Sequence, residues 1–379
     1  MKKKKFILIF FLSTASLFSN EVSFSVVGDI MSHELQIVTA FEPSCDCWDY
    51  RFSFEKVKPY LQKTDFTIGN LETTLPGDKK LYSGYPQFGS PDELVDALSW
   101  AGFNILTLAN NHSVDKGLNG ILRTRRIVEK KGILALGTFY SEDHFQKNKV
   151  SFYRKNQILF ALLNYTYGTN GLPVPYPSIV NQIDLELLRD QIEFAKKQNP
   201  DVILLLLHYG KEYKTSPNRY QKTIVHLALK EGVDIVLGGH PHVLQPFELL
   251  KIKDKYGIEK ERLVVWSLGN FISNQLKENT DGGMIFQFKV KKEQKIQILD
   301  IDYIPVYVNF NKKHSILPIH EYLYLSEKNK SYHFTDIENK RYYIHPYPIQ
   351  ESYKKQKMTI FLKNTLDIIK KIPKRMQIQ

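Results

Sequence analysis

Short apolar runs alternate with longer amphipathic stretches through the first three quarters of the chain. Such runs are typical of buried strands, which predicts strands at residues 22–27, 65–68, 103–108, 157–163, 202–207, 234–237 and 263–267. Apolar residues recur at helical spacing between them, which predicts helices at residues 91–101, 118–131, 184–197 and 218–231. Strands that alternate with helices predict an α/β fold with a largely buried sheet.

The pattern changes after residue 290. Apolar and polar residues alternate over residues 296–308, which predicts β-strands that extend the core in an antiparallel manner. The end of the chain is predicted as a helix whose apolar face contains Leu362, Leu366, Ile369 and Ile372. We therefore expect a core domain at residues 21–290, a β-rich extension at 291–350 and a basic helix at 351–379.

Residues 1–20 have the pattern of a targeting signal rather than of a folded element. Lys2 to Lys5 form a positively charged start, and the apolar segment that follows ends near Ser19. This order is typical of a secretory signal peptide, and the segment is short for a membrane span. Leu17 does not suit a cleavage site, so an uncleaved N-terminal anchor remains an alternative. We expect an exported protein, whether periplasmic, extracellular or membrane-anchored at the cell surface.

Composition and charge narrow the class of protein. A chain of 379 residues with 42% hydrophobic and 24% charged residues suits a globular protein of one large domain or two smaller ones. The net charge of +12 includes a basic tail made of Lys354, Lys355, Lys357, Lys363, Lys370, Lys371, Lys374 and Arg375. A basic surface favours anionic partners, although a solvated basic helix is the favoured explanation of the tail over any specific binding role. Nucleic acid is not expected, because the chain has no nucleic-acid-binding motif and is predicted to be exported.

Cys45 and Cys47 are the only cysteines, and one residue separates them. An exported protein can form disulfides, but a bridge between these two would close a very tight ring. We therefore expect a loop pair that is oxidised only occasionally. A metal site would need more ligands than this loop offers.

Polar side chains that can bind metal follow most of the predicted strands. In chain order they are Asp29, Glu72, Asn111, His112, His208, His240, His242 and Asn270. Ligands of α/β sheets bind outside the carboxyl ends of the strands, so these side chains are expected to converge on one cleft. The strongest signal is the glycine-rich turn of residues 238–242, because two histidines on one tight turn can point into the same cleft.

These residue types indicate a site for divalent metal. Imidazole, carboxylate and amide ligands suit Zn, Mn, Fe or Mg ions to differing degrees. Two ions about 4 Å apart activate water and bind the oxygens of an in-line displacement at phosphorus. The chain has no Gly-x-Ser-x-Gly, Walker, Gly-x-Gly-x-x-Gly or His-Glu-x-x-His motif. The sequence therefore predicts one or two divalent ions.

Each of these residues also has a structural explanation. The two histidines of the glycine-rich turn can be exposed or hydrogen-bonded, and Asn111 with His112 can cap a loop. Glu72 can pair with a nearby lysine. For His208 alone, neither role is favoured.

Six segments resemble, in order, the motifs of bacterial capsule synthesis proteins of the CapA/PgsA type. They read Gly-Asp-Ile-Met, Gly-Asn-Leu-Glu-Thr-Thr-Leu, Leu-Ala-Asn-Asn-His-Ser-Val-Asp-Lys-Gly, His-Tyr-Gly-Lys-Glu-Tyr, Gly-Gly-His-Pro-His-Val-Leu-Gln-Pro-Phe-Glu and Ser-Leu-Gly-Asn-Phe. Each is weak alone, but the ordered set spans residues 22–286 and is specific. The resemblance implies a role in poly-γ-glutamate capsule production, with an anionic polymer as a partner and a membrane-bound synthetase complex beside it.

This family resembles the calcineurin-like metallophosphoesterases, which implies a two-sheet sandwich flanked by helices. The resemblance also implies that Asp29 and His242 bind one ion and that Glu72 bridges to a second. The other ligands of the second ion would be Asn111, His208 and His240. His112 would act as a general acid or donate a hydrogen bond to an oxyanion.

The resemblance implies that three further residues either contact the metal ligands from outside or contact the substrate. They are Asp115, Glu212 and Asn270. One position departs from the wider superfamily, whose members typically begin with Asp-x-His. Here Met31 stands where that histidine would be, and His33 has the wrong spacing to replace it. The first ion site is therefore expected to be weak, mononuclear or empty.

Two functions fit these features. The first is a metal-dependent hydrolase that cleaves a phosphoester, or less readily an amide bond, in an envelope polymer or its precursor. The second is a non-catalytic capsule factor, whose cleft or basic tail binds a polyanion during export or anchoring.

Overall fold

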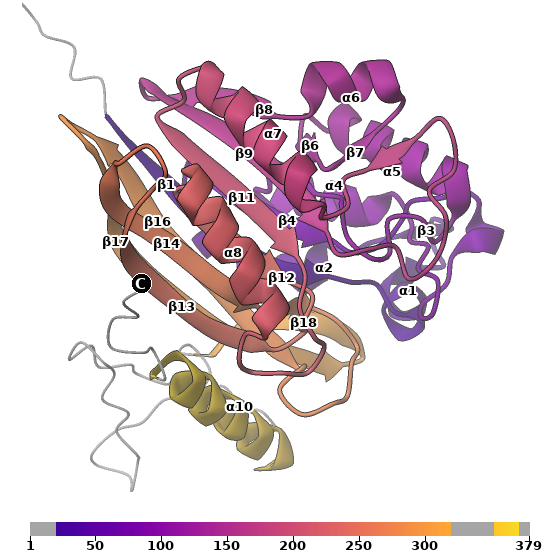
Figure 1. Ribbon diagram of the computed structural model, residues 1–379. Helices are drawn as coiled ribbons and strands as arrows, with labels where there is room; N and C mark the ends of the chain where they lie inside the picture. Colours follow the sequence, from indigo (N-terminus) through magenta and orange to yellow (C-terminus); the bar gives the residue numbers. More distant parts are fainter. Residues whose placement is uncertain (1–19, 320–351, 371–379) are drawn as a thin grey trace, which may run out of the picture.

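The computed structural model describes residues 20–319 and 352–370. Two β-sheets pack face to face, and helices cover the outer face of each (Figure 1). The first sheet has the strand order β18-β17-β16-β1-β4-β5-β6, and β15 also pairs with β1. Its strands are β1 (Glu21–Ile30), β4 (Phe66–Leu71), β5 (Ile105–Thr107), β6 (Leu134–Leu136), β15 (Asn270–Ile272), β16 (Gly282–Lys292), β17 (Ile296–Asn311) and β18 (Lys313–Pro318).

The second sheet has the strand order β13-β14-β12-β11-β9-β8. The four inner strands are parallel, and the two edge strands, β8 and β13, are antiparallel to their neighbours. The strands are β8 (Ser151–Lys155), β9 (Ile158–Thr166), β11 (Val202–His208), β12 (Ile235–Gly239), β13 (Leu244–Lys253) and β14 (Glu259–Leu268). All four parallel strands therefore end at the same edge of this sheet.

Helices pack on both outer faces. The second sheet is covered by α7 (Leu185–Lys197) and α8 (Arg219–Glu231), and the first by α2 (Arg51–Phe54), α3 (Lys58–Leu61), α4 (Glu93–Ala101) and α5 (Gly117–Lys130). The remaining short elements are α1 (Glu34–Ala40), η1 (Lys79–Leu81), α6 (Glu142–Asn148) and the strand pairs β2 (Phe41–Glu42) with β3 (Cys47–Trp48) and β7 (Thr138–Phe139) with β10 (Ile179–Val180).

Side chains that alternate along the strands build layered hydrophobic cores. In β1, Phe24 and Val26 pack between the sheets, whereas Val27 and Ile30 pack against the helices. Successive residues of β11 divide between the two faces in the same way. Both faces of these strands are buried, which explains why they appear in the sequence as continuous apolar runs.

The predicted fold class is confirmed, because the chain forms an α/β sandwich of two sheets flanked by helices. The predicted strands correspond to β1, β4, β5, β9, β11, β12 and β14, and the predicted helices to α4, α5, α7 and α8.

The β-rich segment after residue 290 continues the first sheet. β16, β17 and β18 are consecutive antiparallel strands of that sheet, so residues 296–318 belong to the sandwich. The rest of the predicted extension, residues 320–350, lies outside the described residues, as does the predicted signal peptide or anchor at residues 1–19.

The C-terminal helix is α10 (Ser352–Lys370), and it packs against β13 and β17. Leu362, Leu366 and Ile369 are buried as the apolar face predicts, whereas Ile372 lies outside the described residues. Of the basic tail, Lys357 and Lys363 are exposed on α10, and nothing is described of the other side chains. Across residues 20–319 and 352–370, no helix has the length and apolar character needed to cross a membrane.

Cys45 and Cys47 form a disulfide, which differs from the expected loop pair with only occasional oxidation. Cys45 lies in the turn between the short strands β2 and β3, and Cys47 is the first residue of β3. That turn brings their Cα atoms to 5.2 Å, within the range that a disulfide spans.

Candidate metal centre

The carboxyl ends of strands from both sheets meet at one place. Asp29 lies at the end of β1, and Glu72 directly follows β4 in the same sheet. His208 ends β11, and His240 directly follows β12 in the second sheet. The candidate ligands therefore come from both halves of the sandwich.

Backbone contacts fix the strand ends where the sheets approach. The Asp29 amide donates to the carbonyl of Gly269 at 3.0 Å, and the Glu72 amide donates to that of Ile30 at 2.9 Å. A Cβ atom on Gly28 would lie 1.9 Å from the carbonyl oxygen of Gly269. Only glycine permits this approach, which holds Asp29 against the second sheet.

The turn after β12 holds two histidines in an uncommon backbone conformation. His240 has a φ of 94° and His242 a φ of 59°, a region that costs a non-glycine residue about 1–3 kcal/mol. The surrounding contacts hold this turn. The His240 amide donates to Asp29 Oδ2 at 3.2 Å, and the Tyr213 amide donates to the Pro241 carbonyl at 2.8 Å.

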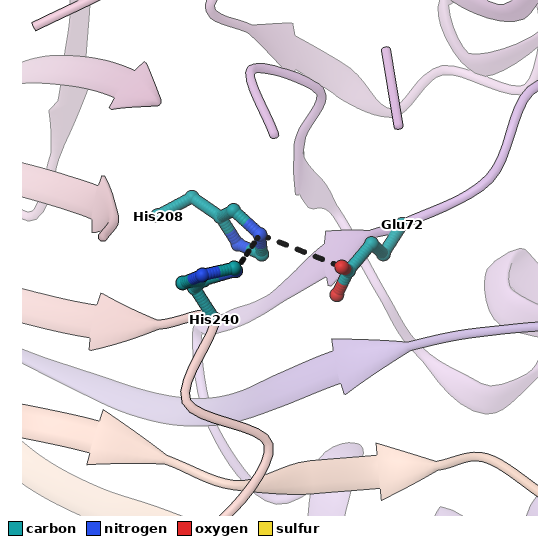
Figure 2. A group of neighbouring side chains, drawn as sticks. All are labelled: Glu72, His208 and His240. Atoms are coloured by element: carbon teal, nitrogen blue, oxygen red, sulfur yellow. Dashed lines mark hydrogen bonds and ion pairs between the residues drawn. The ribbon is translucent and has the colours of Figure 1, made fainter. Parts of the chain in front are cut away.

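One group of candidate ligands consists of Glu72, His208 and His240, whose ligand atoms lie within 4.8 Å of one another. Figure 2 shows the two imidazoles and the carboxylate pointing toward one another. His208 Nε2 lies 3.4 Å from Glu72 Oε1 and 3.2 Å from His240 Nδ1. The carboxamide oxygen of Asn111 lies 2.7 Å from the same Nε2 atom. The other three predicted ligands of the second ion therefore lie close to the Nε2 atom of His208.

A second group consists of Asp29, Glu72 and His242. His242 Nδ1 lies 3.2 Å from Asp29 Oδ2, and His242 Nε2 lies 3.9 Å from Glu72 Oε1. Asn270 also contacts this imidazole, because its Oδ1 atom lies 3.0 Å from His242 Nδ1. Glu72 belongs to both groups, as expected of a bridging carboxylate.

The donor set fits a divalent metal ion. The side chains of Asp29 and Glu72 are completely buried, and Glu72 Oε1 has no hydrogen-bond partner. Its ion-pair partners in the described part of the chain are His208 and His242 rather than a lysine. A buried carboxylate that faces imidazole nitrogens is an arrangement in which a bound cation would satisfy every group.

Burial and neighbouring charges shift the pKa values in opposite directions. Burial lowers the pKa of His242, but the carboxylates of Glu72 and Asp29 outweigh it and raise that pKa to about 9. Burial lowers the pKa of His240 well below its usual range, and His208 and His242 lower it further. Burial raises the pKa of Asp29, but the hydrogen bond from His242 and the charges of His208 and His242 bring it below its ordinary value. Strong perturbation of this kind is typical of functional sites.

His112 lies beside this cluster and is held by Asp115. Its Nδ1 atom is 2.6 Å from Asp115 Oδ2, and both side chains are buried. Asp115 also accepts a hydrogen bond from the Phe88 amide, and the Phe88 ring meets the imidazole edge-on. Asn110, not Asn111, caps the loop by accepting from the His112 amide. The carboxylate thus fixes the orientation of the imidazole.

Residues 23–275 match the family model for the bacterial capsule synthesis protein PGA_cap, which covers more than half of the chain. The chain belongs to this family of capsule synthesis proteins. It is 28% identical over 294 residues to the capsule biosynthesis protein CapA of Bacillus anthracis, a match that covers 75% of this chain and 67% of the relative. It is also 28% identical over 280 residues to the PGA biosynthesis protein CapA of Bacillus subtilis strain 168, covering 73% and 70%.

Among solved structures, this capsule synthesis protein is similar to the calcineurin-like phosphoesterase YfkN from Bacillus subtilis. The match covers 93% of this chain and 99% of that one, with 14% sequence identity and a TM-score of 0.41.

Asn70 was not among the predicted site residues of this capsule synthesis protein. Its carboxamide nitrogen donates to Asp29 Oδ1 at 2.8 Å and lies 3.1 Å from His208 Nδ1, and its oxygen accepts from Asn110. It therefore orients two candidate ligands at once. Its position at the end of β4, two residues before Glu72, is the signal that could have identified it.

The rim of the centre is formed by residues after β9 and β11. The Tyr167 ring lies 4.5 Å from that of His240, and its hydroxyl donates to Asn170. The Asn111 carboxamide nitrogen donates to the same Asn170 oxygen, which fixes Asn111. Glu212, predicted as an outer residue, is half-buried and lies beside the histidine turn.

Met31 and His33 supply no ligand to either group in the described residues. Met31 is buried, and His33 accepts a hydrogen bond from the Asn274 amide. Burial lowers the pKa of His33 to about 4, so the imidazole is neutral at pH 7.

Proposed function

We propose that this capsule synthesis protein is an exported hydrolase that uses divalent metal ions to cleave a phosphoester of the capsule polymer or of its precursor. The observation that supports this most directly concerns the fully buried Oε1 atom of Glu72. This atom has no hydrogen-bond partner, and it lies near ring nitrogens of His208 and His242. The other oxygen of this carboxylate, Oε2, accepts from the Asn70 carboxamide at 3.4 Å, so Oε1 is the atom that a cation would satisfy.

In this proposal Asp29 and His242 would hold one ion, and Asn111, His208 and His240 would hold the other. Glu72 would contribute to both. Divalent metal in such a site activates a water molecule and polarises an oxygen on phosphorus. Mixed imidazole and carboxylate ligands are compatible with Mn, Fe, Zn or Mg ions.

The proposed acid is His112. Asp115 accepts from one ring nitrogen and so orients the imidazole. In the imidazolium form the other ring nitrogen also carries a proton, which is the one that His112 would donate. Such a group delivers a proton to the leaving oxygen as the bond to phosphorus breaks. Asn70 and Asn270 act indirectly, because each holds a candidate ligand in place.

The names of the relatives support the biological setting. They are described as capsule or PGA biosynthesis proteins, so we propose an envelope polymer such as poly-γ-glutamate, or its precursor, as the partner. A membrane-bound synthetase complex beside the protein belongs to the same proposal. The Cys45–Cys47 disulfide supports export, since disulfides persist in oxidising compartments.

A turnover assay tests the proposal. Chelator-treated protein is reloaded with Mn²⁺, and hydrolysis of bis(p-nitrophenyl) phosphate is followed. We expect His240→Ala to lower kcat/KM more than about 100-fold, because it removes a ligand that two candidate groups share.

The matched control is His226→Ala, which removes an exposed histidine on α8 far from the strand ends. It should leave turnover unchanged. Metal-independent turnover, or equal turnover by both variants, would contradict the proposal.

A further inference from the structure

Glu212 completes a third group of candidate ligand atoms. Its carboxylate lies with the imidazole nitrogens of His240 and His242, all within 4.8 Å of one another. These two histidines already belong to the other two groups, together with Glu72. The three groups are therefore joined into one continuous set of ligands.

The backbone holds Glu212 in this position. The Tyr209 amide donates to the Gly239 carbonyl at 3.1 Å, and the Tyr213 amide donates to the Pro241 carbonyl at 2.8 Å. Both ends of the segment that carries Glu212 are thus tied to the histidine turn. Gly210 permits this path, because its φ is 111° and a Cβ there would lie 2.7 Å from the Gln221 carboxamide.

The charge of Glu212 acts on the same site. It contributes, after burial and the buried carboxylates, to the raised pKa of His242. Burial raises the pKa of Tyr167 to about 12, and Glu212 and Glu72 raise it in the same direction. The carboxylate therefore faces the interior of the centre as well as solvent.

The two ion sites of the proposed function differ in ligand number. The second has Glu72 with Asn111, His208 and His240. The first has only Asp29, Glu72 and His242. Structural and catalytic metal sites generally offer three or four protein ligands, and harder ions such as Mn²⁺ take more oxygen ligands than Zn²⁺.

We infer that Glu212 is a metal ligand, supplying the fourth protein group to the ion held by Asp29 and His242. This inference rests on the proposed function. A third carboxylate makes the site harder, which favours Mn²⁺ over Zn²⁺. Glu212 is half-buried, whereas Asp29 and Glu72 are fully buried, so Glu212 is the carboxylate of this site that is accessible to solvent.

Isothermal titration calorimetry with Mn²⁺ on the metal-free protein tests the inference. We expect Glu212→Gln to weaken one Mn²⁺ binding event at least about 10-fold. Glu212→Asp, which keeps the carboxylate, should recover part of the affinity. Glu261→Gln, which changes an exposed glutamate on β14, should bind Mn²⁺ as the wild type does.

The outcomes separate the two proposals. Thermal unfolding without metal should be the same for wild type and Glu212→Gln, which shows that the variant is folded. Unchanged Mn²⁺ affinity in folded Glu212→Gln would overturn the role of Glu212 and leave the proposed function intact. A wild type that binds no Mn²⁺ would overturn both.

Discussion

Glu72 illustrates how a single buried atom indicates a ligand. Its Oε1 atom has no hydrogen-bond partner, although imidazole nitrogens of His208 and His242 lie 3.4 and 3.9 Å away. An unsatisfied buried polar atom costs about 1–3 kcal/mol, and more when it is charged. The fold therefore includes an unfavourable free energy at a place where strands of both sheets end. A cation bound to Glu72 would offset that free energy.

The pairing of His112 with Asp115 leads to a prediction at this scale. Asp115→Asn weakens the hydrogen bond that fixes the imidazole tautomer, so we expect kcat to fall about 100-fold with little change in KM. Mn²⁺ affinity should be unchanged, since Asp115 contacts no candidate ligand.

Steady-state kinetics, with Mn²⁺ titration alongside, separates the effect on kcat from that on KM and on metal affinity. Asp143→Asn, at an exposed aspartate on α6, is the control. An Asp115→Asn variant with the wild-type kcat would show that the carboxylate is only structural.

Close approach of strands explains why glycines recur at the strand ends. A Cβ on Gly238 would lie 2.1 Å from the carbonyl oxygen of Trp266, which belongs to the neighbouring strand β14. No side-chain movement can relieve a clash with backbone. β12 would have to shift, and with it the histidine turn that follows.

We therefore expect Gly238→Ala to lower the free energy of unfolding by at least about 2 kcal/mol. Gly168→Ala is the matched control, because a Cβ there meets no atom within 4 Å. Urea denaturation measures both variants. Equal unfolding midpoints for the two would contradict the close approach at Gly238.

The elements were predictable where both faces of a strand are buried. β9, β11, β12 and β14 appear in the sequence as unbroken apolar runs, and each was predicted within a few residues. β13 and β16 were not predicted as separate strands. Their burial alternates over their later residues, so neither appears as an unbroken apolar run. β13 pairs with the next strand, β14, whereas β16 pairs with β1, which is distant in the chain.

At the scale of the whole molecule, the sequence predicted that ligands converge but not how. It placed candidate metal ligands after most of the predicted strands, and the structure brings them together. The division of β1 and β4 into one sheet and β11 and β12 into the other depends on pairings distant in the chain, such as β1 with β16. Asn70 was missed for a similar reason, since an asparagine at a strand end is common in turns.

The two-sheet architecture gives the centre its rigidity. Asp29 and Glu72 are attached to strands of the first sheet. His208 and His242 are attached to strands of the second. A shared hydrophobic layer, which includes Phe24 and the β11 side chains, fixes one sheet against the other. An ion between the sheets would join both halves, so metal binding should be coupled to the stability of the whole sandwich.

The most direct test of the central claim is anomalous diffraction from crystals of chelator-treated protein soaked in Mn²⁺. Collection at a wavelength where manganese scatters anomalously locates the ion without assumptions about activity. The account predicts a difference peak within coordinating distance of Glu72, between His208 and His240, with a second peak beside Asp29 and His242 if both sites fill. A map with no peak at Glu72 under saturating Mn²⁺ would contradict it.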